Sequence, residues 1–354
     1  MNVCYFIANS PHYLPSVLPL LEETGGFILT SCRGIKRYIQ RYYDDLGMEL
    51  NNRESRYEVI YYRRNCSPAR VISPLKIEVM VHPSFSLHYF KEISGLKHVQ
   101  IFHGTSDKPF NFHKSIARYD LIAVPGPKMR DDIINRGLAD PSRIAVIGYP
   151  KIDYFLHSSF DRNKFIEKLG LDKSKKTVLY SPTWDDPDRY SSFSRYTITL
   201  LRTLKDVNLI IKPHPNILKF RPWQVMKAYV WKRKNAFFYL NNRSILPFME
   251  VSDLLITDIS SVSHEYLPFN RPMVFLDPKP GKRIPSEHVW MWHCGDVVEK
   301  KEQIPRVVYD NLEHPDKYHK ERLRALRMVF LNFDGKSPVR FRENLLNLQE
   351  GYIH

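Results

Sequence analysis

Three short polar segments carry the residue types that could do chemistry, and each follows an apolar run. They are His103-Gly104-Thr105, Lys212-Pro213-His214-Pro215 and Asp258-Ile259-Ser260-Ser261. A histidine titrates near neutral pH and can accept a proton from a hydroxyl group. Glycine lets the backbone approach a ligand closely, and a serine-rich helix start presents N–H groups to an anion. The three segments therefore suit a reaction at a phosphate group.

Each segment by itself also has an ordinary structural explanation, and the residues alone leave both explanations open. The chain contains 14 histidines, so one histidine in a loop is commonly structural or solvated. Ser260-Ser261 can simply cap the helix that we expect over about 262–267. Taken together, the segments offer a base in the first half and phosphate ligands in the second half. A two-domain transferase needs this combination of groups.

Apolar runs of strand length alternate with helical patterns and place each segment at the carboxyl end of a predicted strand. We expect strands at 3–8, 27–30, 57–62, 77–81, 99–102, 121–124, 144–147, 178–181, 209–212, 237–240, 254–257 and 273–276. This alternation predicts an α/β fold of two Rossmann-like domains that face each other across a cleft. The expected boundaries are 1–155 for the first domain, 156–335 for the second and 336–354 for a C-terminal helix.

The composition is that of a soluble globular protein, but the charge is unusual. The chain has 53 Lys and Arg against 38 Asp and Glu, a net charge of +15. Such a surplus indicates an anionic partner, which could be nucleic acid, anionic lipid or a phosphorylated substrate. The four cysteines are widely separated, which predicts reduced thiols rather than a zinc site or disulfides. We see no signal peptide and no run long enough to span a bilayer.

Two basic segments rich in aromatic residues, 33–46 and 223–234, have compositions that suit the headgroup region of an anionic bilayer. Their apolar side chains could equally face the core while the cations are solvated. A run of acidic residues, Asp185-Asp186-Pro187-Asp188, could suggest a divalent cation site. A polar turn is the commoner explanation of such a run, and we predict no metal ligand.

Six ordered motifs resemble the CDP-glycerol glycerophosphotransferase family, the primases and polymerases of teichoic acids and related capsule enzymes. The resemblance runs in register from about residue 98 to 345. The segments are His103-Gly104-Thr105, Gly148-Tyr149-Pro150-Lys151-Ile152-Asp153, Tyr180-Ser181-Pro182-Thr183-Trp184, Lys212-Pro213-His214-Pro215, Thr257-Asp258-Ile259-Ser260-Ser261-Val262 and Phe333-Asp334-Gly335-Lys336-Ser337.

The resemblance implies a GT-B-like fold and transfer of a polyol phosphate from a CDP-linked donor, with CMP released. It implies a lipid-linked or cell-envelope glycan as acceptor and peripheral attachment to an anionic membrane surface, at the cytoplasmic face of a bacterial membrane. No cofactor, metal or nucleic acid is expected. The expected catalytic residues are His103 as general base, His214 and Asp258. The expected substrate-binding residues are Gly104, Thr105, Pro182, Thr183, Lys212, Ser260, Ser261 and Val262.

Departures from the family pattern at Ser106, Asp185-Asp186 and Ile259 leave open which polyol phosphate is transferred. A nucleotide-sugar glycosyltransferase of capsule or lipopolysaccharide synthesis is the main alternative, since it would use the same fold. A third interpretation is a basic RNA-binding protein, but no RNP, KH or zinc-finger motif supports it. Whether one unit or many are added is also open.

Overall fold

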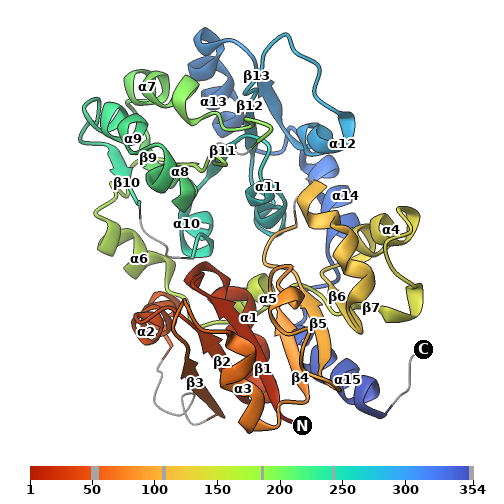
Figure 1. The fold of residues 1–354 in the computed structure, drawn as a ribbon. Coiled ribbons are helices and arrows are strands. Elements are labelled where there is room, and N and C mark those ends of the chain that lie inside the picture. The colour runs from red at the N-terminus through yellow and green to blue at the C-terminus, as the bar shows by residue number, and fades with distance from the viewer. Residues whose placement is uncertain (49–55, 106–108, 185–186, 241–243, 351–354) are drawn as a thin grey trace. The chain divides into compact units, whose positions relative to one another are not determined.

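The structure is a computed structural model that describes residues 1–48, 56–105, 109–184, 187–240 and 244–350 (Figure 1). It divides the chain into two compact units. Unit 1 comprises Met1–Phe160 with Arg327–His354, and unit 2 comprises Asp161–Leu326. Unit 1 therefore consists of two separate stretches of the chain, whereas the sequence predicted a continuous first domain that ends at residue 155. The chain leaves unit 1 after Phe160 and returns to it at Arg327. A polar stretch around 158–176, expected from the sequence to link the two domains, contains helix α6 (Arg162–Leu169).

Unit 1 is built on a seven-stranded sheet in the order β3-β2-β1-β4-β5-β6-β7, in which all neighbouring strands are parallel. Its strands are β1 (Val3–Ala8), β2 (Gly26–Thr30), β3 (Tyr57–Tyr61), β4 (Val79–His82), β5 (Lys97–Ile101), β6 (Leu121–Val124) and β7 (Ile144–Val146). Its helices are α1 (Leu14–Thr24), α2 (Ile35–Leu46), α3 (Pro68–Ile72), α4 (Pro127–Asn135), α5 (Pro150–Leu156) and α15 (Ser337–Glu350).

Unit 2 is built on a six-stranded parallel sheet in the order β10-β9-β8-β11-β12-β13. Its strands are β8 (Thr177–Tyr180), β9 (Asn208–Ile211), β10 (Ala236–Phe238), β11 (Leu254–Thr257), β12 (Met273–Leu276) and β13 (Asp296–Val298). Its helices are α6 (Arg162–Leu169), α7 (Phe193–Thr203), α8 (Pro215–Phe220), α9 (Pro222–Tyr229), α10 (Leu246–Val251), α11 (Ser261–Tyr266), α12 (Ser286–Val289), α13 (Ile304–Glu313) and α14 (His319–Val329), whose last residues belong to unit 1.

These elements confirm the predicted α/β class. The central strands are buried along their whole length, which is why they read as continuous apolar runs. Short 3-10 helices complete the connections: η1 (Pro11–Tyr13), η3 (Ser73–Leu75), η4 (Leu87–Tyr89), η5 (Pro109–Phe112), η6 (Lys114–Arg118), η7 (Pro141–Arg143), η8 (Leu267–Phe269), η9 (Trp290–Cys294) and η10 (Lys301–Gln303). Strand β13 was not expected from the sequence, because it begins with Asp296 and its apolar run has only two residues.

Two of the six sequence motifs meet inside unit 1 and anchor the C-terminal helix α15. The buried carboxylate of Asp153 accepts the N–H groups of Gly335 at 2.8 Å and of Ser337 at 3.0 Å. Gly148 has a φ of 92°, and a Cβ there would lie 3.2 Å from the Cβ of Ser337. Arg340 donates to the carbonyl of Ile147 at 3.1 Å. The contacts of these two motifs are those of a structural anchor.

The basic helix α2 turns its apolar side chains into the core of unit 1. Ile35, Ile39 and Tyr42 are all buried, while Lys36 and Arg37 are exposed. The structure therefore favours the core-facing alternative for segment 33–46. None of the helices in the described ranges is both long and apolar enough to cross a bilayer.

A buried histidine pair lies at the end of β4. His82 Nε2 is 3.0 Å from His98 Nδ1, and His82 Nδ1 is 2.8 Å from the Ser86 hydroxyl. Burial and the neighbouring His98 keep the pKa of His82 well below its ordinary value. Burial also lowers the pKa of His98, against the opposing charge of Asp120. Both rings are therefore neutral in the folded protein at neutral pH.

This pair predicts acid sensitivity of the fold. Because the folded pKa values lie below the unfolded value of about 6.5, the unfolded chain binds more protons below that pH. We expect the free energy of unfolding to be at its full value above pH 7 and to fall as the pH drops towards 5. Urea unfolding at a series of pH values measures this slope. It should be smaller in His82→Gln and unchanged in His293→Gln, which alters an exposed ring. A slope unaffected by His82→Gln would contradict the prediction.

Candidate functional site

In unit 1 the candidate site is formed by turns that follow three neighbouring strands, β1, β4 and β5. His103 follows β5, and its Nδ1 lies 2.6 Å from the carbonyl oxygen of Pro83, which follows β4. Since a carbonyl oxygen can only accept, Nδ1 carries the proton. In the neutral ring Nε2 is then the atom with the free lone pair. This tautomer, inferred from the hydrogen bond, is the one that a general base at Nε2 requires.

The surroundings of His103 hold its ring neutral. The ring of Tyr13, in the turn after β1, has its centroid 4.4 Å from that of His103. Burial lowers the pKa of His103 to about 4, with a further decrease from the charge of Lys151, while the Pro83 carbonyl opposes the shift. The imidazole is thus ready to accept a proton at neutral pH. An anionic substrate beside it would raise its basicity, because the imidazolium would then be stabilised.

Gly104 and Thr105 continue the same turn. The hydroxyl of Thr105 is buried and has no hydrogen-bond partner among the described residues. Ser106 lies outside the described residues. The sequence interpretation missed Tyr13, Pro83 and His12, whose ring centroid lies 5.8 Å from that of His103. The polar segment Asn9-Ser10-Pro11-His12, directly after the strand expected at 3–8, was the available signal for His12 and Tyr13.

In unit 2 the candidate residues follow β9, β8 and β11, which are neighbours in the sheet. The strand order reverses between β8 and β11, and ligands of such folds bind at the carboxyl ends of strands at this switch point. Backbone contacts join the turns. The N–H of His214 donates to the carbonyl of Pro182 at 3.2 Å, and the Ser181 hydroxyl donates to the carbonyl of Lys212 at 2.9 Å. The structure therefore brings Pro182, Thr183, Lys212, His214 and Asp258–Ser261 to one edge.

Asp258 is placed to organise this edge. Its carboxylate is 1% exposed. One oxygen accepts the N–H of Thr183 at 2.9 Å, and the other accepts the N–H and hydroxyl of Ser192 at 2.8 and 2.7 Å. These contacts tie the turn after β11 to the segment that leads into α7. They favour a positioning role over the direct catalytic role expected from the sequence, and Ser192 was not anticipated.

His214 is held in the tautomer opposite to that of His103. Its Nδ1 accepts the N–H of Asn216 at 3.1 Å, because His214 caps helix α8. The proton of the neutral ring is therefore on Nε2, which is a hydrogen-bond donor. A donor suits a phosphate oxygen. Lys212 is buried, with its ammonium group 5.1 Å from the ring centroid of Phe248.

Ser260 begins helix α11 as its N-cap and accepts the N–H of Val262 at 3.4 Å. Ser260, Ser261 and Val262 are each partly exposed. Asp277 follows β12, and burial raises its pKa above the ordinary value. The acidic run at 185–186 lies outside the described residues. In the described part of the chain, no group of three or more His, Cys, Asp or Glu could hold a metal ion.

Two Rossmann-like units, each with polar turns at the carboxyl ends of its own parallel sheet, define the GT-B-like class of α/β proteins. Comparison with family models shows which family within this class the chain belongs to. Residues 51–347 match the family described as CDP-Glycerol:Poly(glycerophosphate) glycerophosphotransferase. The match covers most of the chain, and the chain belongs to this family.

Curated relatives are teichoic acid enzymes. The chain is 28% identical over 183 residues to the teichoic acid poly(glycerol phosphate) polymerase of Bacillus spizizenii, covering 49% of this chain and 45% of that protein. It is 26% identical over 230 residues to the teichoic acid ribitol-phosphate primase of the same organism, covering 63% and 58%. The chain thus spans about half the length of the curated relatives it matches.

Solved structures share the fold. A variant of the wall teichoic acid polymerase TagF matches with a TM-score of 0.70 at 18% identity, covering 100% of this chain and 90% of that chain. A putative UDP-N-acetylglucosamine 2-epimerase from Listeria monocytogenes matches with a TM-score of 0.67 at 13% identity, covering 99% and 97%. At these identities the likeness concerns the fold alone.

Proposed function

We propose that the chain transfers glycerol phosphate, or a related polyol phosphate, from a CDP-linked donor to a lipid-linked or cell-envelope glycan acceptor, with release of CMP. Membership of the glycerophosphotransferase family supports the reaction class. The observation that carries the proposal is the hydrogen bond from His103 to Pro83, which leaves Nε2 able to accept a proton. The relatives named above use glycerol or ribitol phosphate, so the polyol itself stays open.

In the proposed reaction, a hydroxyl oxygen of the acceptor attacks the phosphorus that carries the polyol. The bond from this phosphorus to the bridging oxygen breaks, and CMP leaves. The hydroxyl proton passes to Nε2 of His103. His214 Nε2–H, Lys212 and the start of α11 would hold the diphosphate oxygens, where negative charge develops. Gly104 and Thr105 would contact the acceptor, and Pro182 and Thr183 would shape the donor pocket.

Release of CMP tests the proposal directly. Purified protein would be incubated with CDP-glycerol, with and without a lipid-linked disaccharide acceptor, and CMP would be quantified. Acceptor-dependent release supports the proposed reaction. If CDP-glycerol and CDP-ribitol both yield no CMP while a nucleotide sugar yields a nucleoside diphosphate, the protein is a glycosyltransferase and the proposal is wrong.

The start of α11 leads to a prediction about donor affinity. Ser260→Ala removes the hydroxyl that accepts the Val262 N–H, and Ser261→Ala removes the neighbouring hydroxyl. Each loss of a hydrogen bond to a charged group should weaken donor binding by about 1.5–3 kcal/mol, roughly tenfold to a hundredfold. Calorimetric titration with CDP-glycerol measures it, and Ser174→Ala, at the opposite edge of the sheet, is the control. Unchanged affinity in both variants would remove these serines from the donor site.

We also propose that the protein acts as a peripheral protein at the cytoplasmic face of a bacterial membrane, because its acceptor would be lipid-linked. An exposed apolar surface on unit 2, formed by Trp223, Met226 and Val230, supports the proposal. Vesicle flotation at low salt tests it. Absence of binding to anionic vesicles would dismiss peripheral attachment without bearing on CMP release.

A further inference from the structure

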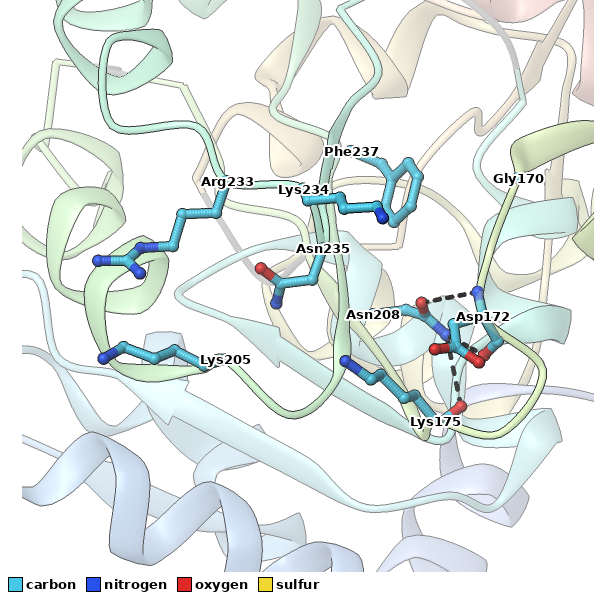
Figure 2. Close-up of a pocket in the computed structure, with 9 residues that line it drawn as sticks. All are labelled: Gly170, Asp172, Lys175, Lys205, Asn208, Arg233, Lys234, Asn235 and Phe237. Carbon is cyan, nitrogen blue, oxygen red and sulfur yellow. Dashed lines mark hydrogen bonds between the residues drawn. The ribbon is translucent and has the colours of Figure 1, made fainter.

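A cationic pocket opens at the amino ends of β8, β9 and β10, the edge of the unit 2 sheet opposite to the candidate site. Its volume is about 570 Å³. Figure 2 shows Lys205 and Arg233 on one side and Lys175 on the other, with Asn235 between them. Lys234 and Phe237 also line the pocket. A pocket of this size accommodates a phosphate group with its ester substituent.

The positive charge of the pocket is only partly compensated. Asp172 interacts electrostatically with Lys175 and Lys234. Within the described ranges, none of Lys175, Lys205, Arg233 and Lys234 lies at ion-pair distance from a carboxylate. The acidic residue of the lining is Asp172, and its carboxylate accepts the hydroxyl and N–H of Ser174 at 2.6 and 3.0 Å. Four cations against one carboxylate leave a net positive field that favours an anion.

The side-chain amides of two asparagines hold the walls of the pocket in place. Asn208 is 2% exposed, and its side chain accepts the N–H of Asp172 at 3.0 Å and donates to the carbonyl of that residue at 2.8 Å. Asn235 donates to the carbonyls of Leu204 and Val207, both at 2.8 Å. The segments that carry the four cations are therefore fixed by hydrogen bonds rather than free to collapse into the pocket.

Helix α9 and the residue after it carry an exposed apolar face, which precedes two of the pocket's cations in the chain. Trp223 is 75% exposed, Met226 57% and Val230 83%. Their spacing of three and four residues places them on one side of the helix, while Val225 and Ala228 on the other side are buried in the core of unit 2. A group of large apolar side chains left in water marks an interaction surface.

The apolar face and the pocket are neighbours in the chain, because Val230 is followed directly by Trp231, Lys232, Arg233 and Lys234, and the last two line the pocket. Trp231 is 42% exposed, with the Arg202 guanidinium 5.1 Å from its ring centroid. Residues 215–235 contain six Lys and Arg and no acidic residue. Exposed tryptophan beside clustered cations is the composition that binds the headgroup boundary of an anionic bilayer.

We propose that this surface, termed the α9 surface, docks on an anionic lipid bilayer. The side chains of Trp223, Met226 and Val230 enter the boundary region, and the pocket of Lys175, Lys205, Arg233 and Lys234 binds a headgroup phosphate. The inference deepens the proposed peripheral function and rests on it. Of the two segments whose composition suits a bilayer, 33–46 and 223–234, it assigns membrane contact to the second, in unit 2.

Vesicle flotation of full-length variants tests the α9 surface. The vesicles would be phosphatidylcholine alone or mixed with phosphatidylglycerol. A cation near an anionic surface contributes about 1 kcal/mol, so Lys205→Gln with Arg233→Gln should weaken binding to the mixed vesicles roughly 30-fold. Trp223→Ser with Val230→Ser should also weaken it. Arg306→Gln with Lys320→Gln removes the same charge from exposed positions on α13 and α14 and should have a much smaller effect.

Two results would overturn the proposal. One is an equal loss of vesicle binding in the α9-surface variants and in the Arg306/Lys320 control, which would reduce the effect to net charge. The other is normal flotation of the α9-surface variants combined with loss of binding to single-stranded RNA, which would make this a nucleic-acid surface. CMP release with a soluble acceptor analogue should be normal in all these variants. If the unmodified protein released no CMP, this result would contradict the proposed reaction but would leave the proposed docking surface standing.

Discussion

Replacing His103 by asparagine should reduce transfer by about 10²–10⁴-fold while leaving donor affinity nearly unchanged. The asparagine amide can still donate to the Pro83 carbonyl, as Nδ1 does at 2.6 Å, but it has no atom equivalent to Nε2. The substitution therefore removes the proposed base and retains its anchor. His103→Ala removes both and should be at least as severe.

Single-turnover CMP formation and calorimetric donor binding separate these effects. His293→Asn, at an exposed position, should be indistinguishable from the unmodified protein. If His103→Asn retained most of its turnover, another group would be the base. If it lost donor binding in proportion to turnover, His103 would instead be a donor ligand.

The pH profile follows from the same residue. With a pKa of about 4, the His103 imidazole is neutral in the free enzyme across pH 6–8. The pH dependence of kcat/KM reports the pKa values of groups in the free enzyme. The apparent pKa at which kcat/KM falls in acid because His103 becomes protonated should therefore lie well below 6.5. An acid limb at 6.5 that disappears in His103→Asn would contradict the low pKa.

Asp258→Asn should lower the stability of unit 2 and weaken donor binding while largely preserving kcat at saturation. The carboxylate accepts three hydrogen bonds, and an amide presents one oxygen and one NH₂ group in its place. The NH₂ group of the asparagine then faces either the Thr183 N–H or the Ser192 N–H, so that two donors oppose each other. We expect a loss of about 2–4 kcal/mol in the free energy of unfolding, since a buried donor is left without an acceptor.

Asp253→Asn provides a matched control at the other edge of the sheet, where this carboxylate accepts the N–H of Thr177 at 2.7 Å. It should lower stability without changing donor affinity. Urea unfolding, donor titration and saturating kinetics would be compared for the two variants. If Asp258→Asn lost turnover by more than a hundredfold with stability and donor affinity intact, Asp258 would be a catalytic residue rather than a positioning one.

Local pattern was sufficient to predict the α/β class, nearly all the strands, and the polar turns that follow them. Buried parallel strands are apolar throughout, so runs such as Leu254–Thr257 stand out from the amphipathic helices around them. Parallel strands all end at the same edge of their sheet. The carboxyl-end placement of His103, His214 and Ser260 therefore followed from sequence.

Contacts between residues far apart in the chain could be decided only by the tertiary structure. Segments 33–46 and 223–234 have similar compositions, yet the apolar side of the first packs in a core, whereas the second also leaves Trp223, Met226 and Val230 exposed. Composition records which side chains are present, whereas burial depends on what packs against them. Similarly, the sequence alone does not show that Asp153 anchors α15, because its hydrogen-bond partners, Gly335 and Ser337, lie more than 180 residues away in the chain. The histidine tautomers were set by a distant carbonyl for His103 and by cap geometry for His214, and neither has a sequence signature.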